Sequence, residues 1–281
     1  MHPANFDYHR ANSIDEAESL YKANADASFL AGGHSLIPAM KLRLAEPGTL
    51  VDIAGIDDLK GITRDGDTIR IGALTTHAEV ENSDVVNDAC TALAEAAGMI
   101  GDPQVRNRGT IGGNVAHADP ASDYPGILMA LGATIVTSGR SIAVDDFFTG
   151  LFETALDEGE MIKEIQVPAL GDGSGAAYAK FFNPASRYAV VGVGAVVSMD
   201  NGSCSSCRIG VTGAADHVFR ASAVEETLTG SDLGDEAIAT AAAKVADGQE
   251  MLSDLVASAH YRAHLCGVMA KRAIIEAASR A

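Results

Sequence analysis

The chain has 281 residues, 47% of them hydrophobic, so it can bury a sizeable core, and we expect two or three lobes. Its formal net charge of −18 and its lack of Trp exclude nucleic acid as the expected partner, because phosphate backbones are bound by Lys and Arg and bases stack on aromatic rings. No apolar run reaches the ~20 residues that span a bilayer, no secretory signal opens the chain, and four cysteines are too scattered for a disulfide framework, so we expect a cytoplasmic protein with reduced thiols.

Helices and strands alternate in the predicted pattern of the first half of the chain, because apolar residues recur with periods of about 3.6 and 2 in turn. In chain order the predicted elements are a helix at 14–23 capped by Ser13, a strand at 27–30, a helix at 36–44, strands at 50–53 and 68–71, helices at 88–97 and 126–132, and a strand at 133–137. This order predicts an α/β domain.

The pattern changes after a cluster of Pro, Gly, Asp and Ser at 168–175, which indicates a domain boundary. The predicted elements that follow are strands at 176–182, 190–199 and 207–212, with a hairpin turn at Asn201-Gly202, and three helices from residue 221 onward, the last at 253–279. We therefore expect a domain at 1–169, with sub-lobes at about 1–55 and 56–169, and a domain at 174–281 in which a three-stranded antiparallel sheet packs on a helical bundle. The fold class is α+β.

The first chemically informative segment is Ala31-Gly32-Gly33-His34-Ser35-Leu36, in which paired glycines and a hydroxyl join a predicted strand to a predicted helix. Glycines let the backbone approach phosphate oxygens and adopt positive φ, and the start of a helix presents unpaired N–H groups. Ser35 is expected to cap the helix and to donate to phosphate. The segment predicts a diphosphate site, with an ordinary strand-to-helix turn as the alternative.

A second pair of glycines lies about 80 residues later, in Thr110-Ile111-Gly112-Gly113-Asn114. Two such loops can hold one diphosphate from both sides. Downstream, Ser122 or Asp123 is a natural N-cap for the next helix, and the Asp123 carboxylate can instead accept hydrogen bonds from ribose hydroxyls.

Other motifs are weaker or absent. The chain has neither the Gly-x-Gly-x-x-Gly pattern with its downstream acidic residue nor a P-loop, which excludes both of those nucleotide sites. Gly192-Val-Gly194 lies inside an apolar strand pattern and indicates close packing. Neither Cys204-Ser-Ser-Cys207 nor the pair of His260 and His264 has the further ligands that a metal centre needs, so no metal site is expected.

Taken jointly, Ala31 to Ser35 and Thr110 to Asn114 resemble the two FAD loops of the flavoprotein subunits of molybdenum hydroxylases. The resemblance covers essentially the whole chain, including Pro-x-x-Phe-x-Tyr at 3–8, Leu-Val-Asp-Ile at 50–53 and the Ser-Asp pair at 122–123. The chain is most similar to the medium subunits of aerobic carbon monoxide dehydrogenases. This likeness implies a two-lobed, PCMH-type FAD-binding domain followed by a smaller flavoprotein domain.

The resemblance also implies which residues bind FAD. Those of the two loops, expected at the diphosphate, are Ala31, Gly32, Gly33, His34, Ser35, Leu36, Thr110, Ile111, Gly112, Gly113 and Asn114. Asp123 is implied at the ribose or adenine end, Lys180 near the flavin, and Tyr188 beside the isoalloxazine, where a core or hairpin tyrosine is the alternative. The segment at 181–187 departs from the more basic run of some carbon monoxide dehydrogenase subunits, and this departure leaves the substrate open.

The family further implies a heterotrimer, commonly doubled, with a small [2Fe–2S] subunit and a large molybdopterin subunit. The flavin passes electrons from the iron–sulfur centres to an external acceptor, and no residue of this chain is expected to act as nucleophile or base. Carbon monoxide is one candidate substrate of such a complex, and a purine, aldehyde, aromatic acid or nicotine-like heterocycle is another. Two rival functions are a self-contained flavin reductase or oxidase and a flavin-free assembly scaffold.

Overall fold

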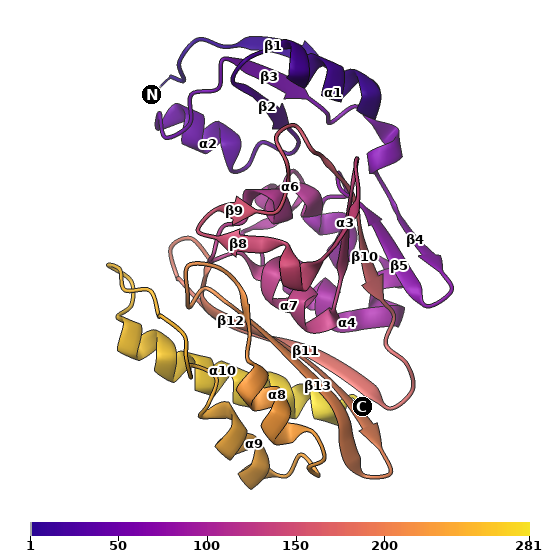
Figure 1. Cartoon of the computed structure of the whole chain (residues 1–281), viewed down its shortest axis with the longest axis vertical. Helices are drawn as coiled ribbons and strands as arrows, with labels where there is room; N and C mark the ends of the chain where they lie inside the picture. The colour runs from indigo at the N-terminus through magenta and orange to yellow at the C-terminus, as the bar shows by residue number, and fades with distance from the viewer. Residues whose placement is uncertain (1) are drawn as a thin grey trace.

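The computed structural model describes residues 2–281 and arranges them in three tiers that follow one another from the N-terminus to the C-terminus (Figure 1). A small parallel sheet forms the first tier, an antiparallel sheet with several helices the second, and a second antiparallel sheet with three helices the third. The predicted α+β class is confirmed. Among residues 2–281, none of the helices combines the length and the apolar character that crossing a bilayer requires.

The N-terminal tier comprises β1 (Asp7–Arg10), α1 (Ile14–Ala23), β2 (Ala27–Leu30), α2 (Leu36–Lys41), β3 (Thr49–Asp52) and the 3-10 helix η1 (Asp57–Leu59). Its strands are parallel in the order β1-β3-β2. Helix α1 and strand β2 have the predicted bounds, and Ser13 caps α1 by accepting from the Glu16 amide. Helix α2 ends earlier than predicted, because Arg43 turns into the left-handed region at φ 59°. The sequence did not predict β1, whose four residues are all exposed and show no apolar alternation.

The middle tier has thirteen elements. They are β4 (Ile62–Asp65), β5 (Thr68–Gly72), α3 (His77–Glu81), α4 (Asp84–Gly98), α5 (Pro103–Arg106), α6 (Ile111–His117), α7 (Asp123–Leu131), β6 (Thr134–Thr137), β7 (Ser141–Ala143), η2 (Val144–Asp146), β8 (Phe148–Gly150), β9 (Glu153–Thr154) and β10 (Ile162–Pro168). Five strands form an antiparallel sheet in the order β4-β5-β10-β6-β7. The central strand, β10, was missed because a register shift between Ile162 and Glu164 breaks the period-2 pattern.

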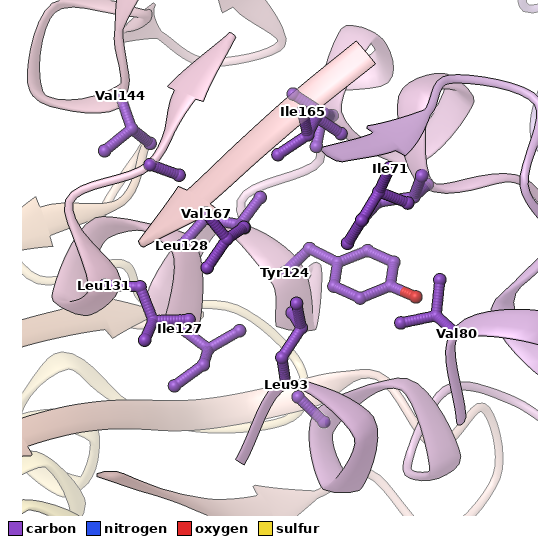
Figure 2. Close-up of a cluster of buried hydrophobic side chains, with 14 of the residues drawn as sticks. Ile71, Val80, Leu93, Tyr124, Ile127, Leu128, Leu131, Val144, Ile165 and Val167 are labelled. Carbon is purple, nitrogen blue, oxygen red and sulfur yellow. The ribbon is translucent and has the colours of Figure 1, made fainter. Parts of the chain in front are cut away.

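The core of the middle tier lies between this sheet and helices α4 and α7. Figure 2 shows the Tyr124 ring of α7 among aliphatic side chains of the sheet and of α4, with its hydroxyl directed toward Val80 of α3. Tyr124 is fully buried, and its hydroxyl has no hydrogen-bond partner among residues 2–281. The core thus contains an unpaired hydroxyl, that of Tyr124, next to α3.

The C-terminal tier comprises β11 (Ser174–Phe182), β12 (Ala189–Asp200), β13 (Ser203–Thr212), β14 (Phe219–Arg220), α8 (Ser222–Leu228), α9 (Asp235–Ala242) and α10 (Ala259–Ser279). The three predicted strands are present, and the hairpin turn is confirmed by positive φ at Asn201 and Gly202. The sheet has a fourth strand, however, because β14 is too short to give a sequence pattern. Helix α10 begins later than predicted, since Ser258 caps it by accepting from the Tyr261 amide.

Helices cover both faces of the C-terminal sheet, α10 on one side and α7 of the middle tier on the other. Gly194 and Gly210 pair across β12 and β13, and a Cβ on either would overlap the backbone of α7 at Gly126. A Cβ on Gly192 would overlap the Tyr178 hydroxyl. The predicted close packing at Gly192 and Gly194 is confirmed, and it ties the helix that follows the second glycine loop to the C-terminal sheet.

Candidate functional site

The first glycine loop connects β2 to α2 and packs against the second glycine segment. A Cβ on Gly32 would overlap the carbonyl oxygen of Arg108 and would lie 3.0 Å from the Cα of Gly109. Gly33 has φ +72°, a conformation that favours glycine. Each glycine is therefore required for its own reason, one by close approach and the other by its backbone conformation.

The amides of this loop are free. None of the backbone N–H groups from Gly32 to Leu36 has an acceptor within residues 2–281, although the carbonyls of Gly33 and Ser35 accept from the next turn of α2. Ser35 does not cap the helix as predicted, because its backbone is already helical at φ −109° and ψ −50°. Its hydroxyl lies instead beside the Tyr188 hydroxyl. A row of unpaired N–H groups suits an anionic group such as a phosphate.

The second glycine loop lies at the start of α6, and its amides are already used. The N–H groups of Ile111 and Gly112 donate to the carbonyls of Thr75 and Ala73 at 3.0 and 2.9 Å. Those of Gly113 and Asn114 donate to the hydroxyl and carbonyl of Thr110 at 3.2 and 3.0 Å. This loop therefore has no free backbone N–H groups for a ligand and contributes only a surface without large side chains.

The two glycines of that surface have different surroundings. Gly112 is buried, and a Cβ there would lie 2.5 Å from the Cβ of Ala73. Gly113 is exposed, and a Cβ there would lie 3.8 Å from the Cβ of Ala31 in the first loop. The structure thus brings the two loops together, as the sequence predicts, and no side chain projects from Gly113 toward the first loop.

A cavity of about 580 Å³ opens between the loops, a size typical of cofactor sites. The expected residues that line it are Ala31, Gly32, Gly33, His34, Ser35, Leu36, Thr110, Gly112, Gly113, Asn114 and Tyr188. Ile111 does not line it, because its side chain is fully buried in the middle core. Tyr188, which lies between β11 and β12 and is 42% exposed, forms part of the wall on the C-terminal side.

Sequence reasoning missed much of the remaining wall. On the side of the N-terminal tier, the rings of Tyr21 and Phe29 stack at 4.8 Å, and Gly159 packs against Tyr21. On the side of the middle tier, His77 and Ile100 line the cavity. Most of these residues lie in helices or loops where an apolar or polar residue gives no signal of its own.

Asp123 and Lys180 do not line the cavity but form a buried ion pair behind the second loop. Their side chains are 5% and 3% exposed, and the Lys180 Nζ donates to the Asp123 carboxylate at 2.7 Å and to the Met99 carbonyl at 3.0 Å. The Tyr178 hydroxyl donates to the other carboxylate oxygen at 2.7 Å. The structure therefore supports neither of the two roles expected for Asp123, a helix cap or a ribose acceptor, since long-range partners already occupy its carboxylate.

Burial dominates the electrostatics of this pair. It raises the pKa of Asp123 and lowers the pKa of Lys180, and the attraction between the two groups opposes both shifts. The pair joins β11 to the start of α7 and to the carbonyl of Met99, which precedes the cavity residue Ile100. Its position indicates a structural clamp that holds the wall of the cavity.

Ser122 links the second loop to the same region. It precedes α7 without making a capping bond, and its hydroxyl donates instead to the Asn114 side-chain oxygen. The Ser122 carbonyl accepts from the Thr212 hydroxyl of β13 at 2.7 Å. Asn114 is thereby held from the C-terminal sheet through one intermediate residue.

Comparisons with known proteins agree with this geometry. Residues 4–170 match the family described as "FAD binding domain in molybdopterin dehydrogenase", and residues 176–277 match "CO dehydrogenase flavoprotein C-terminal domain". The chain is 40% identical to the carbon monoxide dehydrogenase medium chain of Hydrogenophaga pseudoflava, over 100% of this chain and 99% of the relative. It is 38% identical to subunit alpha of the 6-hydroxypseudooxynicotine dehydrogenase complex of Paenarthrobacter nicotinovorans, over 100% and 97%.

A solved structure gives the same result in three dimensions. A chain of the carbon monoxide dehydrogenase from Hydrogenophaga pseudoflava that lacks the Mo-pyranopterin moiety superimposes with a TM-score of 0.97 at 41% identity. The superposition covers 100% of this chain and 99% of that chain. Free amides, close-packed glycines and an apolar wall also fit FAD as the ligand.

Replacing Lys180 with Met should lower the free energy of unfolding by about 3–5 kcal/mol, because it leaves the Asp123 carboxylate buried without its partner. Urea unfolding of the chain measures the effect. Lys22→Met, which breaks an exposed pair with Glu18, is the matched control and should change stability by no more than about 0.5 kcal/mol. Equal effects of the two variants would contradict the clamp.

Acid should destabilise the chain through His77, whose pKa burial lowers from 6.5 to about 4, with smaller contributions from His34 and Arg106. Between those values the unfolded imidazole binds a proton that the folded one does not, so stability is full above pH 6.5 and falls as the pH drops toward 4. The loss at pH 5 is about 2 kcal/mol. Urea unfolding at pH 7 and pH 5 should show that His77→Gln removes this part of the pH dependence, whereas identical profiles would contradict it.

Proposed function

The chain belongs to the FAD-binding flavoprotein subunits of molybdenum hydroxylases, and we propose that it holds FAD between its two glycine loops and passes electrons from an iron–sulfur subunit to an external acceptor. The observation that carries this proposal is the row of free amides from Gly32 to Leu36 beside the close-packed wall at Gly113. FAD, when bound, supplies the redox chemistry. The residues of this chain bind it, orient it and exclude water from it.

The first loop is proposed to bind the diphosphate. The amides of residues 32–36 are donors without acceptors within residues 2–281, so an anion can take them without displacing an existing hydrogen bond. The second loop is proposed to set the width of the cavity, with the Asn114 side chain fixed by Ser122. Tyr188 and the apolar residue Ile100 are proposed to cover the flavin from the C-terminal and middle tiers.

Asp123 and Lys180 have an indirect, structural role in this proposal. Their buried pair holds the start of α7 and the segment at Met99, so it shapes the wall rather than contacting the cofactor. No step of electron transfer requires a nucleophile or a base from this chain.

The partners are proposed to be a small [2Fe–2S] subunit and a large molybdopterin subunit, in a dimer of heterotrimers. The chain spans nearly the full length of the medium chains it resembles, and among residues 2–281 no group of three or more His, Cys, Asp or Glu side chains is placed to hold a metal. All four cysteines are buried and unpaired, in keeping with a cytoplasmic location.

Carbon monoxide is the first candidate substrate of the proposed complex, since medium chains of carbon monoxide dehydrogenases align over the whole length at 40% and 39% identity. A nicotine-type heterocycle is the second, because a subunit of a 6-hydroxypseudooxynicotine dehydrogenase complex reaches 38%. Both candidates leave the role of the flavin unchanged.

Purification of the affinity-tagged chain from its own host tests the assignment. We expect two further subunits to co-purify, with molybdenum, iron and FAD in the same fraction. Addition of carbon monoxide, or separately of the nicotine-type heterocycle, should bleach the flavin absorbance. A yellow protein of one subunit without molybdenum would establish a self-contained flavoenzyme instead. An intact complex without flavin would establish a scaffold.

Replacing Gly32 with Ala should weaken FAD binding at least roughly tenfold, because the new Cβ overlaps the Arg108 backbone carbonyl and forces the two loops apart. Titration of the deflavinated protein with FAD measures the affinity. Gly171→Ala is the control, since a Cβ there meets no atom within 4 Å, and it should bind FAD as the native chain does. Native affinity in Gly32→Ala would refute the role assigned to the loop contact.

A further inference from the structure

His77 is a polar residue in the cavity wall that the proposed function does not yet use. It is the first residue of α3, and its amide donates to the carbonyl of Gly109 at 3.0 Å. This bond places the imidazole directly beside the second glycine segment. The residue is only 4% exposed, yet it lines the cavity.

The two ring nitrogens have different surroundings. Nδ1 is fully buried and has no partner within residues 2–281. The ring lies 5.4 Å from that of Tyr124, whose hydroxyl is directed toward α3 and is also unpaired (Figure 2). Nε2 lies at the opposite edge of the imidazole, beside Gly109, where a Cβ on residue 109 would come within 2.6 Å of it.

Glycine at position 109 therefore leaves room for the imidazole, because any side chain there would overlap Nε2. Gly109 and His77 both line the cavity, and a side chain at 109 would occupy the space next to Nε2. Nε2 makes no hydrogen bond within residues 2–281 and, unlike Nδ1, is not fully buried, so a ligand in the cavity can reach it. Burial also holds the pKa of His77 at about 4, which keeps the ring neutral near pH 7 and leaves one nitrogen as donor and one as acceptor.

We propose that His77 is a further cofactor-binding residue, whose neutral imidazole offers Nε2, past Gly109, to a polar atom of the bound FAD. The inference rests on the proposed function, because it requires FAD in this cavity. It differs from the roles of the two loops, since it draws on a side chain of α3 that neither glycine motif contains.

Three substitutions at position 77 separate binding from packing. The Gln amide nitrogen can take the place of Nε2, the Asn amide nitrogen that of Nδ1, and Leu replaces the ring with an apolar group. FAD titration of the deflavinated protein, purified with whatever subunits accompany it, measures the affinity. We expect His77→Gln to bind FAD within about threefold of native, and His77→Asn and His77→Leu to bind roughly 5- to 10-fold more weakly.

The melting temperature without FAD is the second readout. Leu removes a buried unpaired nitrogen, so the flavin-free His77→Leu variant should melt at or above the native temperature while its FAD affinity falls. A purely structural histidine would instead lower both together. Tyr124→Phe, which removes the neighbouring unpaired hydroxyl, is the matched control and should leave FAD affinity within about twofold.

The outcomes distinguish this inference from the proposed function. Native protein that takes up no FAD would refute both. Native protein that binds FAD while His77→Leu binds it equally well would refute only the role of His77. If His77→Leu does not fold, the comparison of Gln with Asn decides, and equal affinities of those two variants would overturn the assignment to Nε2.

Discussion

The contact between Gly32 and the backbone of Arg108 and Gly109 sets the geometry of the whole cavity. It joins segments that are distant in the sequence and that belong to different tiers of the molecule. The Arg108 carbonyl is part of the backbone, so no change of rotamer can make room for a side chain at position 32. As long as Gly32 stays in contact with the Arg108 carbonyl, the free amides of the first loop face the second glycine loop across the cavity.

The two glycine pairs look alike in sequence but act differently. In the first, glycine gives close approach and positive φ, and the amides from Gly32 to Leu36 are left without acceptors. In the second, the amides already donate to Thr110 and to the carbonyls of Ala73 and Thr75, so these glycines contribute only the shape of the wall. A ligand between the loops receives hydrogen bonds from the first loop, in the N-terminal tier. The second loop, in the middle tier, limits the space around the ligand, so both loops are needed.

Local signals predicted those parts of the fold that depend on local forces. The cap at Ser13, the strand at 27–30 and the Asn201-Gly202 turn were found because each is fixed by neighbouring residues. Strand β10 was missed because its bulge interrupts the alternation that identifies a strand. In the site, the glycine loops could be predicted from their residues, whereas the cavity wall at His77 could not, because only the folded chain shows that an ordinary histidine is buried beside Gly109. Asp123 shows the opposite case, since its position favoured a helix cap and the resemblance implied a ligand role, while its partner, Lys180, lies on a strand of the next tier.

These constraints act on the cofactor and leave the substrate free. The loop contact, the free amides and the buried pair at Lys180 all shape a cavity that fits FAD, and under the proposed function the substrate is oxidised in another subunit. Subunits of this kind can then keep one cavity while their complexes act on unrelated molecules. The similar identities to a carbon monoxide dehydrogenase medium chain and to a 6-hydroxypseudooxynicotine dehydrogenase subunit follow naturally from such a division. The flavin site does not depend on which substrate the complex oxidises. The identity of the substrate therefore has to be sought in the large subunit and in the surface of this chain that contacts the other subunits.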